Sequence, residues 1–229
     1  MGVREENRVA GAATDTSEAT LAHRDCETKR AIMDAARRRF LHYGYKKTTI
    51  DDIALDAGVG KGTVYLYFES KEDILFKIAR DVKGNITEQM RCIASSLATP
   101  EEKLRRMVLA KILSVHDAYT STAHGVELLD MAMEIKMAKC GRGDYEQEAQ
   151  QSLFADVLRE GVSRGQFSLP GDGNAETAAR QLMLAFAGFF PPYTNLCGES
   201  DSRCRVSMES RIGSMLEFLL HGLRRRTPG

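Results

Sequence analysis

The fold is decided by residues 35–75, AARRRFLHYGYKKTTIDDIALDAGVGKGTVYLYFESKEDIL. Apolar residues recur at steps of three and four from about residue 26 to 43, which predicts an amphipathic helix. Gly44 follows, and glycine readily takes the left-handed conformation that ends a helix. The stretch therefore begins with one helix that has an apolar face and a defined end.

Two shorter helices are predicted after this glycine. The Thr49 hydroxyl can cap a helix that runs to Ala57, and Gly58 interrupts the chain before a further helix over about 60–67. Two short helices around a glycine-containing turn, backed by a longer one, form a helix-turn-helix. Residues 24–75 are therefore predicted to be a helix-turn-helix DNA-binding domain.

The second short helix carries polar side chains on one face. Val64 and Phe68 lie one turn apart and are expected to face inward. The residues turned outward are then Lys61, Thr63, Tyr65 and Tyr67. Lysine, threonine and tyrosine can each contact base edges or phosphates when such a helix enters the major groove. Lys71 stands at the start of the next helix, where backbone amides already favour a phosphate.

This stretch resembles the DNA-binding head of the TetR (tetracycline-repressor) family. The matching positions are Phe40, Gly44, Thr48, Thr49, Ile53, Ala54, Ala57, Gly58, Val59, Gly62, Thr63, Tyr65, Tyr67, Phe68, Lys71 and Leu75. The resemblance implies six contacts with DNA. The base or groove contacts are Lys61, Thr63 and Tyr65, and the phosphate contacts are Thr49, Tyr67 and Lys71.

Two positions depart from the family pattern. Leu66 stands where the family often has histidine or another polar residue, so a phosphate contact is not expected there. Gly60 replaces a frequent serine, which removes one possible cap of the recognition helix. The resemblance also implies an all-α homodimer whose second domain holds a ligand cavity, and a helix after the head that moves when ligand binds.

The rest of the chain predicts an all-α protein of about nine helices, because helical spacing continues after the head and the internal prolines fall at breaks. Residues 1–23 lack apolar periodicity and are expected to be a disordered tail that could also touch the DNA minor groove. A long helix is predicted over 71–97, with a possible bend at Gly84. Residues 76–229 are predicted to be a helical ligand-binding and dimerisation domain.

Two late helices, over 175–190 and towards the end of the chain, have regular apolar stripes. With the resemblance, these stripes predict a four-helix dimer interface; the less favoured alternative is that both stripes face the core of one chain. The predicted interface residues are Leu182, Phe186, Ile212, Met215, Leu216 and Leu219.

A ligand pocket is predicted only in outline, for a medium-sized and largely apolar effector. The 10 methionines suit an adaptable apolar pocket, but they also suit ordinary core packing. The candidate lining residues are Met107, His116, Tyr119, Met131, Phe186, Phe189 and Tyr193.

Composition limits the classes of protein and of binding site that this chain can represent. The chain has 32 Lys and Arg and 32 Asp and Glu, but basic residues predominate over 24–80 and acidic ones over 81–223. The 5 cysteines form no CxxC pair, which argues against a zinc site and suits a reducing cytoplasm. Redox sensing through Cys197 and Cys204 is the less favoured alternative. No apolar run is long enough to cross a membrane, and no cofactor is expected.

The sequence thus predicts a DNA-binding repressor that binds a palindromic double-stranded operator as a homodimer and is released by an unknown small molecule. A ligand-responsive activator and a ligand-independent regulator are the nearest alternatives. An all-α enzyme would need a catalytic constellation, and neither an HExxH motif nor a Walker loop occurs. A purely structural helical protein would leave the outward residues of the recognition helix without a role.

Overall fold

The computed structural model describes residues 9–119, 124–139, 145–171, 173–190 and 202–224. These residues form nine α-helices and one short 3-10 helix, so the predicted all-α class is confirmed. The chain divides into two compact units, Met1–Leu75 and Phe76–Gly229. We call the first unit the head and the second the body.

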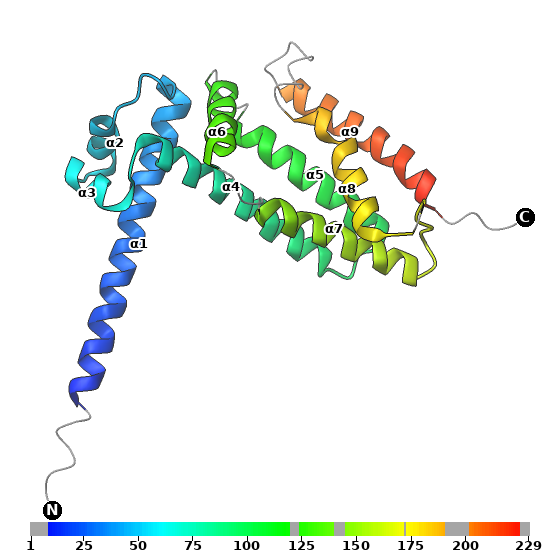
Figure 1. The fold of residues 1–229 in the computed structure, drawn as a ribbon, viewed down its shortest axis with the longest axis horizontal. Coiled ribbons are helices and arrows are strands. Elements are labelled where there is room, and N and C mark those ends of the chain that lie inside the picture. Colours follow the sequence, from blue (N-terminus) through cyan, green and yellow to red (C-terminus); the bar gives the residue numbers. More distant parts are fainter. Residues whose placement is uncertain (1–8, 120–123, 140–144, 172, 191–201, 225–229) are drawn as a thin grey trace, which may run out of the picture. The chain divides into compact units, whose positions relative to one another are not determined.

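The head consists of three helices and the first turn of a fourth. These are α1 (Val9–Tyr43), α2 (Ile50–Ala57), α3 (Lys61–Tyr67) and the start of α4 (Lys71–Ala94). Helix α2 packs against both α1 and α3 (Figure 1). One apolar face of each helix closes the core, whose buried residues include Ile32, Ala35, Ala36, Phe40, Ile53, Ala54, Val64, Phe68, Ile74 and Leu75.

Helix α1 begins earlier than the sequence predicts. It starts at Val9, whereas residues 1–23 were expected to form a disordered tail and the helix to begin near residue 26. The tail prediction is therefore wrong for residues 9–23, and residues 1–8 lie outside the described part. The segment lacks an apolar face, but it is rich in alanine and has no proline, so helix propensity allows α1 to continue backward.

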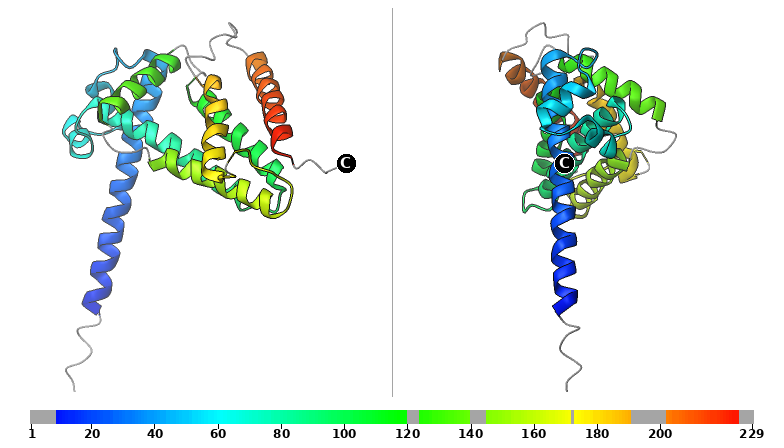
Figure 2. Two further views of the ribbon diagram at one scale, coloured as in Figure 1. Left: turned by 45° about the vertical axis from the view of Figure 1, so that its right-hand side comes forward. Right: turned by 90° about the vertical axis from the view of Figure 1, so that its left-hand side faces the viewer.

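The body contains the rest of α4 and five further α-helices. These are α5 (Pro100–Tyr119), α6 (Gly125–Lys139), α7 (Tyr145–Ser163), α8 (Ala175–Ala185) and α9 (Ser202–Leu223), with the 3-10 helix η1 (Ala187–Phe189) after α8. Helix α5 packs against α6, α7 and α9, and α7 packs against α8 (Figure 2). Helix α4 continues through Gly84, the residue at which a bend was considered.

The core of the body is continuous through five of its helices. Its fully or nearly buried residues include Met90, Leu104, Met107, Ile112, Phe154, Leu158, Ala179, Leu182, Phe186, Ile212, Leu216 and Leu220. Phe167, which follows α7, is also buried in this core. Its ring lies so close to Gly161 that a Cβ at that position would overlap it. A glycine in α7 therefore allows the chain after the helix to fold back onto it.

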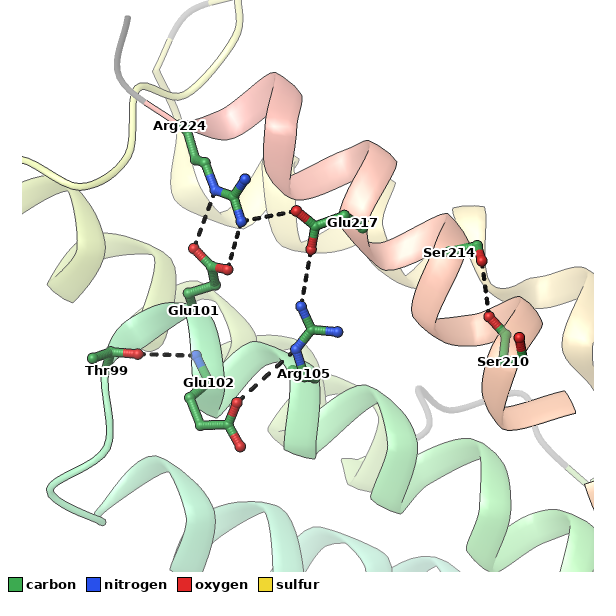
Figure 3. A network of polar contacts seen from close by, with 8 residues as sticks. All are labelled: Thr99, Glu101, Glu102, Arg105, Ser210, Ser214, Glu217 and Arg224. Atoms are coloured by element: carbon green, nitrogen blue, oxygen red, sulfur yellow. Dashed lines mark hydrogen bonds and ion pairs between the residues drawn. The ribbon is translucent and has the colours of Figure 1, made fainter. Parts of the chain in front are cut away.

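The end of α9 is tied to α5 by a network of ion pairs (Figure 3). Arg224 Nη2 lies 2.7 Å from Glu101 Oε1 and 2.9 Å from Glu217 Oε1. Glu217 in turn accepts a hydrogen bond of 3.0 Å from Arg105 Nη2. The backbone N–H of Ser168 also donates to the Leu223 carbonyl oxygen at 2.7 Å. These contacts fix α9 along its apolar contact with α5.

Candidate nucleic-acid interface

The turn between α2 and α3 is set by caps at both ends of α2. Thr49 Oγ1 accepts from the Asp52 backbone N–H at 3.2 Å, and the Thr49 backbone N–H donates to Asp52 Oδ2 at 2.9 Å. This reciprocal capping box lowers the pKa of the Asp52 carboxyl, chiefly through its hydrogen bond with the Thr49 side chain. Gly58 ends the helix with a φ of 68°, which favours glycine.

Helix α3 has one buried face and one exposed face. Val64 is buried within α3 and Phe68 immediately after it, whereas Lys61 and Tyr65 are exposed and Thr63 is half-buried. The side chain of Tyr65 keeps 51% of its surface accessible. The structure therefore places the three predicted base-contacting residues on the outer half of a helix whose other half anchors it in the head.

Two side chains with predicted DNA contacts are held by carboxylates. Lys61 Nζ pairs with Asp51 Oδ2 at 2.8 Å, and this hydrogen bond raises the pKa of the lysine. Tyr67 donates its hydroxyl to Asp25 Oδ1 at 2.8 Å, which raises the pKa of the phenol. Neither pairing was predicted from the sequence, and Asp25 stands 42 positions from Tyr67. DNA must compete with both contacts.

Lys71 has a structural role that the sequence did not predict. Its ammonium donates to the backbone carbonyl oxygens of Tyr45 and Thr48, each at 2.9 Å, and lies 4.3 Å from the centre of the Tyr45 ring. The Tyr45 hydroxyl donates to Glu72 Oε1 at 3.0 Å. The first turn of α4 thereby fixes the turn that follows α1, and the expected phosphate contact of Lys71 stays a prediction.

A bidentate ion pair connects α1 to α2. Arg39 Nε and Nη2 donate to the two carboxylate oxygens of Asp56 at 2.5 and 2.7 Å. The hydrogen bond from Arg39 holds the pKa of the Asp56 carboxyl below its usual range. Since this pair orients α2, it also orients the turn that leads into α3.

Leu66 is an exposed apolar residue on α3. Its side chain is 82% exposed, at the position where the sequence departs from the family pattern. Leu66 has no hydrogen-bonding group, so the side chain itself offers a phosphate no hydrogen bond. It leaves the outer face of α3 more apolar than a histidine would.

Three of the predicted pocket residues, Met107, Phe186 and Phe189, belong to or pack against the core of the body, and the rings of Phe186 and Phe189 have centres 5.8 Å apart. Met107 and Phe186 are buried in the core of the body, whereas His116, Met131 and Phe189 are half-buried. The Tyr119 side chain and all of Tyr193 lie outside the described part. A cavity of about 10 Å³ is lined by Val108, Lys111, Ile112, Phe154, Leu182, Met183, Phe186 and Phe190. Phe186 is thus the one predicted residue on its wall.

The predicted dimer stripe needs a correction. Leu182, Phe186, Ile212 and Leu216 are buried in the body's own core, so their side chains are not exposed to a partner. Helical spacing shows that a face is apolar, but it does not tell which apolar surface covers that face. The remaining two, Met215 and Leu219, are respectively exposed and half-buried. Further exposed apolar residues on these helices are Leu184 on α8 and Val206 and Phe218 on α9.

Within the described residues, no group of three or more His, Cys, Asp or Glu could hold a metal ion. Cys197 lies outside the described part, and the Cys204 side chain is not described. None of the described helices is both long and apolar enough to span a membrane.

Comparison with known proteins gives a family-model match within the head and its junction with the body, and further matches over most of the chain. The family model "Bacterial regulatory proteins, tetR family" matches residues 32–78. The HTH-type transcriptional repressor BepR of Brucella suis biovar 1 is 31% identical over 182 residues, which are 72% of this chain and 78% of BepR.

Two solved structures share the fold. A regulator of the TetR/AcrR family from Thermobifida fusca YX-ER1 has a TM-score of 0.63 and 23% identity, over 86% of this chain and 98% of that one. The regulator FadR of Bacillus subtilis, solved in complex with stearoyl-CoA, has a TM-score of 0.58 and 24% identity, over 84% and 98% of the two chains.

Proposed function

We propose a specific role for this chain, which belongs to the TetR family of bacterial transcriptional regulators. It binds a palindromic operator as a homodimer, represses transcription from that site, and leaves the DNA when the body takes up a small, largely apolar ligand. Its relatives reported above are regulators rather than enzymes. Because its target is bacterial chromosomal DNA, we expect it to act in the cytoplasm.

The outer face of α3 carries this proposal. Val64 anchors α3 in the core of the head. The outer face of the same helix carries Lys61, Thr63 and Tyr65. Thr49 is exposed at the start of α2, one end of the helix-turn-helix, where its side chain can reach a phosphate. In this arrangement α3 enters the major groove while the caps of α2 position the backbone contacts.

The direct test is a matched pair of tyrosine variants. Tyr65 on α3 and Tyr43 at the end of α1 are 51% and 50% exposed, so alanine removes similar surface from each. We expect Tyr65→Ala to weaken binding to the DNA upstream of the protein's own gene by about tenfold or more, as for a lost base contact of about 1–3 kcal/mol. Tyr43→Ala should bind nearly as well as the unchanged protein, as measured by fluorescence anisotropy. Equal losses in the two variants would refute the assignment of α3.

The corrected dimer face lies beside the buried stripe of α9. Phe218 is 75% exposed, and Ser210, Gly213 and Ser214 leave an open groove next to it that would admit a neighbouring helix. A charged residue in a packed apolar interface is unfavourable. Phe218→Glu should therefore yield single chains in sedimentation, while Leu97→Glu, at a fully exposed turn, should leave the mass unchanged.

Repression and release are testable with purified transcription components. The relative BepR is a repressor, and FadR, which shares the fold, was solved with stearoyl-CoA. We expect the protein to lower transcription from its own promoter, and an effector with a long apolar part to restore it. Increased transcription on adding the protein alone would favour the activator reading instead.

A further inference from the structure

A chain of hydrogen bonds crosses the body from α5 through α7 to α4. Lys111 Nζ on α5 donates to Gln150 Oε1 on α7 at 2.8 Å. Gln150 Nε2 donates to Thr87 Oγ1 on α4 at 3.0 Å, and that hydroxyl donates to Glu146 Oε2 at 2.7 Å. Gln150 is only 4% exposed, so both ends of its amide depend on protein partners.

Lys111 is also part of the wall of the small cavity in the body. The other lining residues are apolar: Val108, Ile112, Phe154, Leu182, Met183, Phe186 and Phe190. The Lys111 ammonium lies 6.0 Å from the centre of the Phe190 ring. The cavity therefore has apolar walls and one cationic group.

We propose that Lys111 is the anchor for the acidic group of the effector, which is an amphipathic anion with an apolar chain and a carboxylate or phosphate head. The inference rests on the proposed control by a small molecule. An anion beside an ammonium in a low-dielectric wall forms a charge-assisted hydrogen bond, which is stronger than one between neutral groups. An uncharged ligand of the same shape, such as an alcohol, gains the apolar contacts and a weaker hydrogen bond without the attraction between opposite charges.

The cavity opens when this ligand enters. Its volume of about 10 Å³ holds one water molecule at most. Met183 and Phe190 are half-buried residues on its wall. Methionine adapts its shape easily, so the apolar chain displaces such side chains rather than filling a ready space.

The same hydrogen-bond chain carries ligand binding to α4. When Lys111 turns to the ligand's anion, Gln150 Oε1 loses a donor in a buried position, which is unfavourable. The amide then rearranges, and its contact with Thr87 on α4 changes with it. Helix α4 begins in the head, where Ile74 and Leu75 are buried in the core. A displacement of α4 therefore also disturbs the packing of these two residues. Coupling of this kind requires that the ligand bind the two states unequally.

The test compares anions with their uncharged match in calorimetry without DNA. Decanoate and decyl phosphate are the anionic probes and decanol is the neutral one. We expect both anions to bind the full chain at least about tenfold more tightly than decanol, and the tighter of the two identifies the head group. Lys111→Met should remove this preference, and Lys111→Arg should keep it. Arg106→Met removes an exposed cation from the same helix and should change nothing.

The results have distinct meanings. Decanol binding as tightly as the anions, or an unchanged preference in folded Lys111→Met, would overturn the site. If Lys111→Met does not fold, loss of the preference in Lys111→Arg would also count against it. Because the calorimetry contains no DNA, its failure is separable from a failure of the operator experiment. The link to α4 is tested with Thr87→Val. This variant should still bind decanoate, but the factor by which decanoate lowers operator affinity should be at least about tenfold smaller than in the unchanged protein. An unchanged effect would refute the link to α4.

Discussion

The polar contacts around α2 and α3 in the head differ in burial from the hydrogen-bond chain that crosses the body. In the head, ion pairs and caps lie at the surface, as with Lys61 and Asp51 or Thr49 and Asp52. In the body, Gln150 and Thr87 are buried within the bundle. Surface contacts are exchanged readily for a new partner, whereas a buried polar group keeps its partners or forces a rearrangement. The head is therefore suited to reading a charged surface, and the body to switching between discrete arrangements.

The largest effects are expected from two core substitutions, one in the head and one in the body. Phe40 in the head and Phe154 in the body are almost completely buried, and each alanine variant should cost about 3–5 kcal/mol. We expect Phe40→Ala to raise hydrogen exchange across the head while the body keeps its protection, and Phe154→Ala to do the reverse. Mass spectrometry of peptides from each unit measures this. Uniform loss of protection in either variant would mean that the two units unfold as one.

Two glycines distinguish tight packing from open helix surface within the body. Gly161→Ala should destabilise the body by about 1–3 kcal/mol, because the new Cβ would overlap the Phe167 ring. Gly84→Ala should stabilise it by about 0.5–1 kcal/mol, because the nearest atom, Glu146 Oε1, is 4.0 Å away. Thermal unfolding of the two variants should therefore shift in opposite directions. Stabilisation by both would show that α7 and Phe167 can move apart cheaply.

Each unit offers one threonine that caps a helix. Thr49 caps α2 in the head, and Thr99 Oγ1 accepts from the Glu102 backbone N–H of α5 at 3.2 Å in the body. Alanine at either position should cost about 1 kcal/mol in its own unit. Only Thr49→Ala should also weaken operator binding, and Thr49→Ser should restore the cap. Equal DNA affinity in Thr49→Ala and unchanged protein would remove Thr49 from the interface.

The smallest effect is the response of the head to acid. The pKa of Asp56 is lowered by Arg39, so its pairing contributes stability above the unfolded pKa of about 3.9 and loses it as the pH falls through the folded value. Hydrogen exchange of the head should therefore rise below about pH 4, and less steeply in Asp56→Asn. Asp34→Asn, on exposed α1, is the control and should follow the unchanged protein. Identical profiles in all three proteins would contradict the role of the pair.

The head was largely predictable because its signals are local. Thr49, Gly58 and the spacing of Val64 and Phe68 define caps, a turn and an inward face within twenty residues. The contacts of Asp25 and Lys71 were not predicted. Asp25 lies 42 positions from its partner, and Lys71 lies 26 and 23 positions from its two partners, so no local spacing in the sequence indicates these contacts. Local chemistry thus predicted the frame of the head but not the cross-links between its helices.

The body was less predictable because an apolar stripe on a helix does not indicate which surface covers it. Ile212 and Leu216 were assigned to a second copy, yet they lie in the core of their own chain. Lys111 was overlooked although it interrupts the apolar stripe of α5 between Val108 and Ile112. A charged residue within such a stripe was the available signal.

The pairing of Lys61 with Asp51 has a consequence for the salt dependence of DNA binding. A lysine that moves from water to a phosphate displaces a condensed cation, and the slope of log K against log salt changes by about −0.9 for each phosphate neutralised. When Lys61 leaves Asp51 for DNA, the bared carboxylate attracts a cation as the phosphate releases one. Lys61 should therefore contribute less than a full cation to that slope. The phosphates counted from a salt titration would be fewer than the basic side chains that touch them.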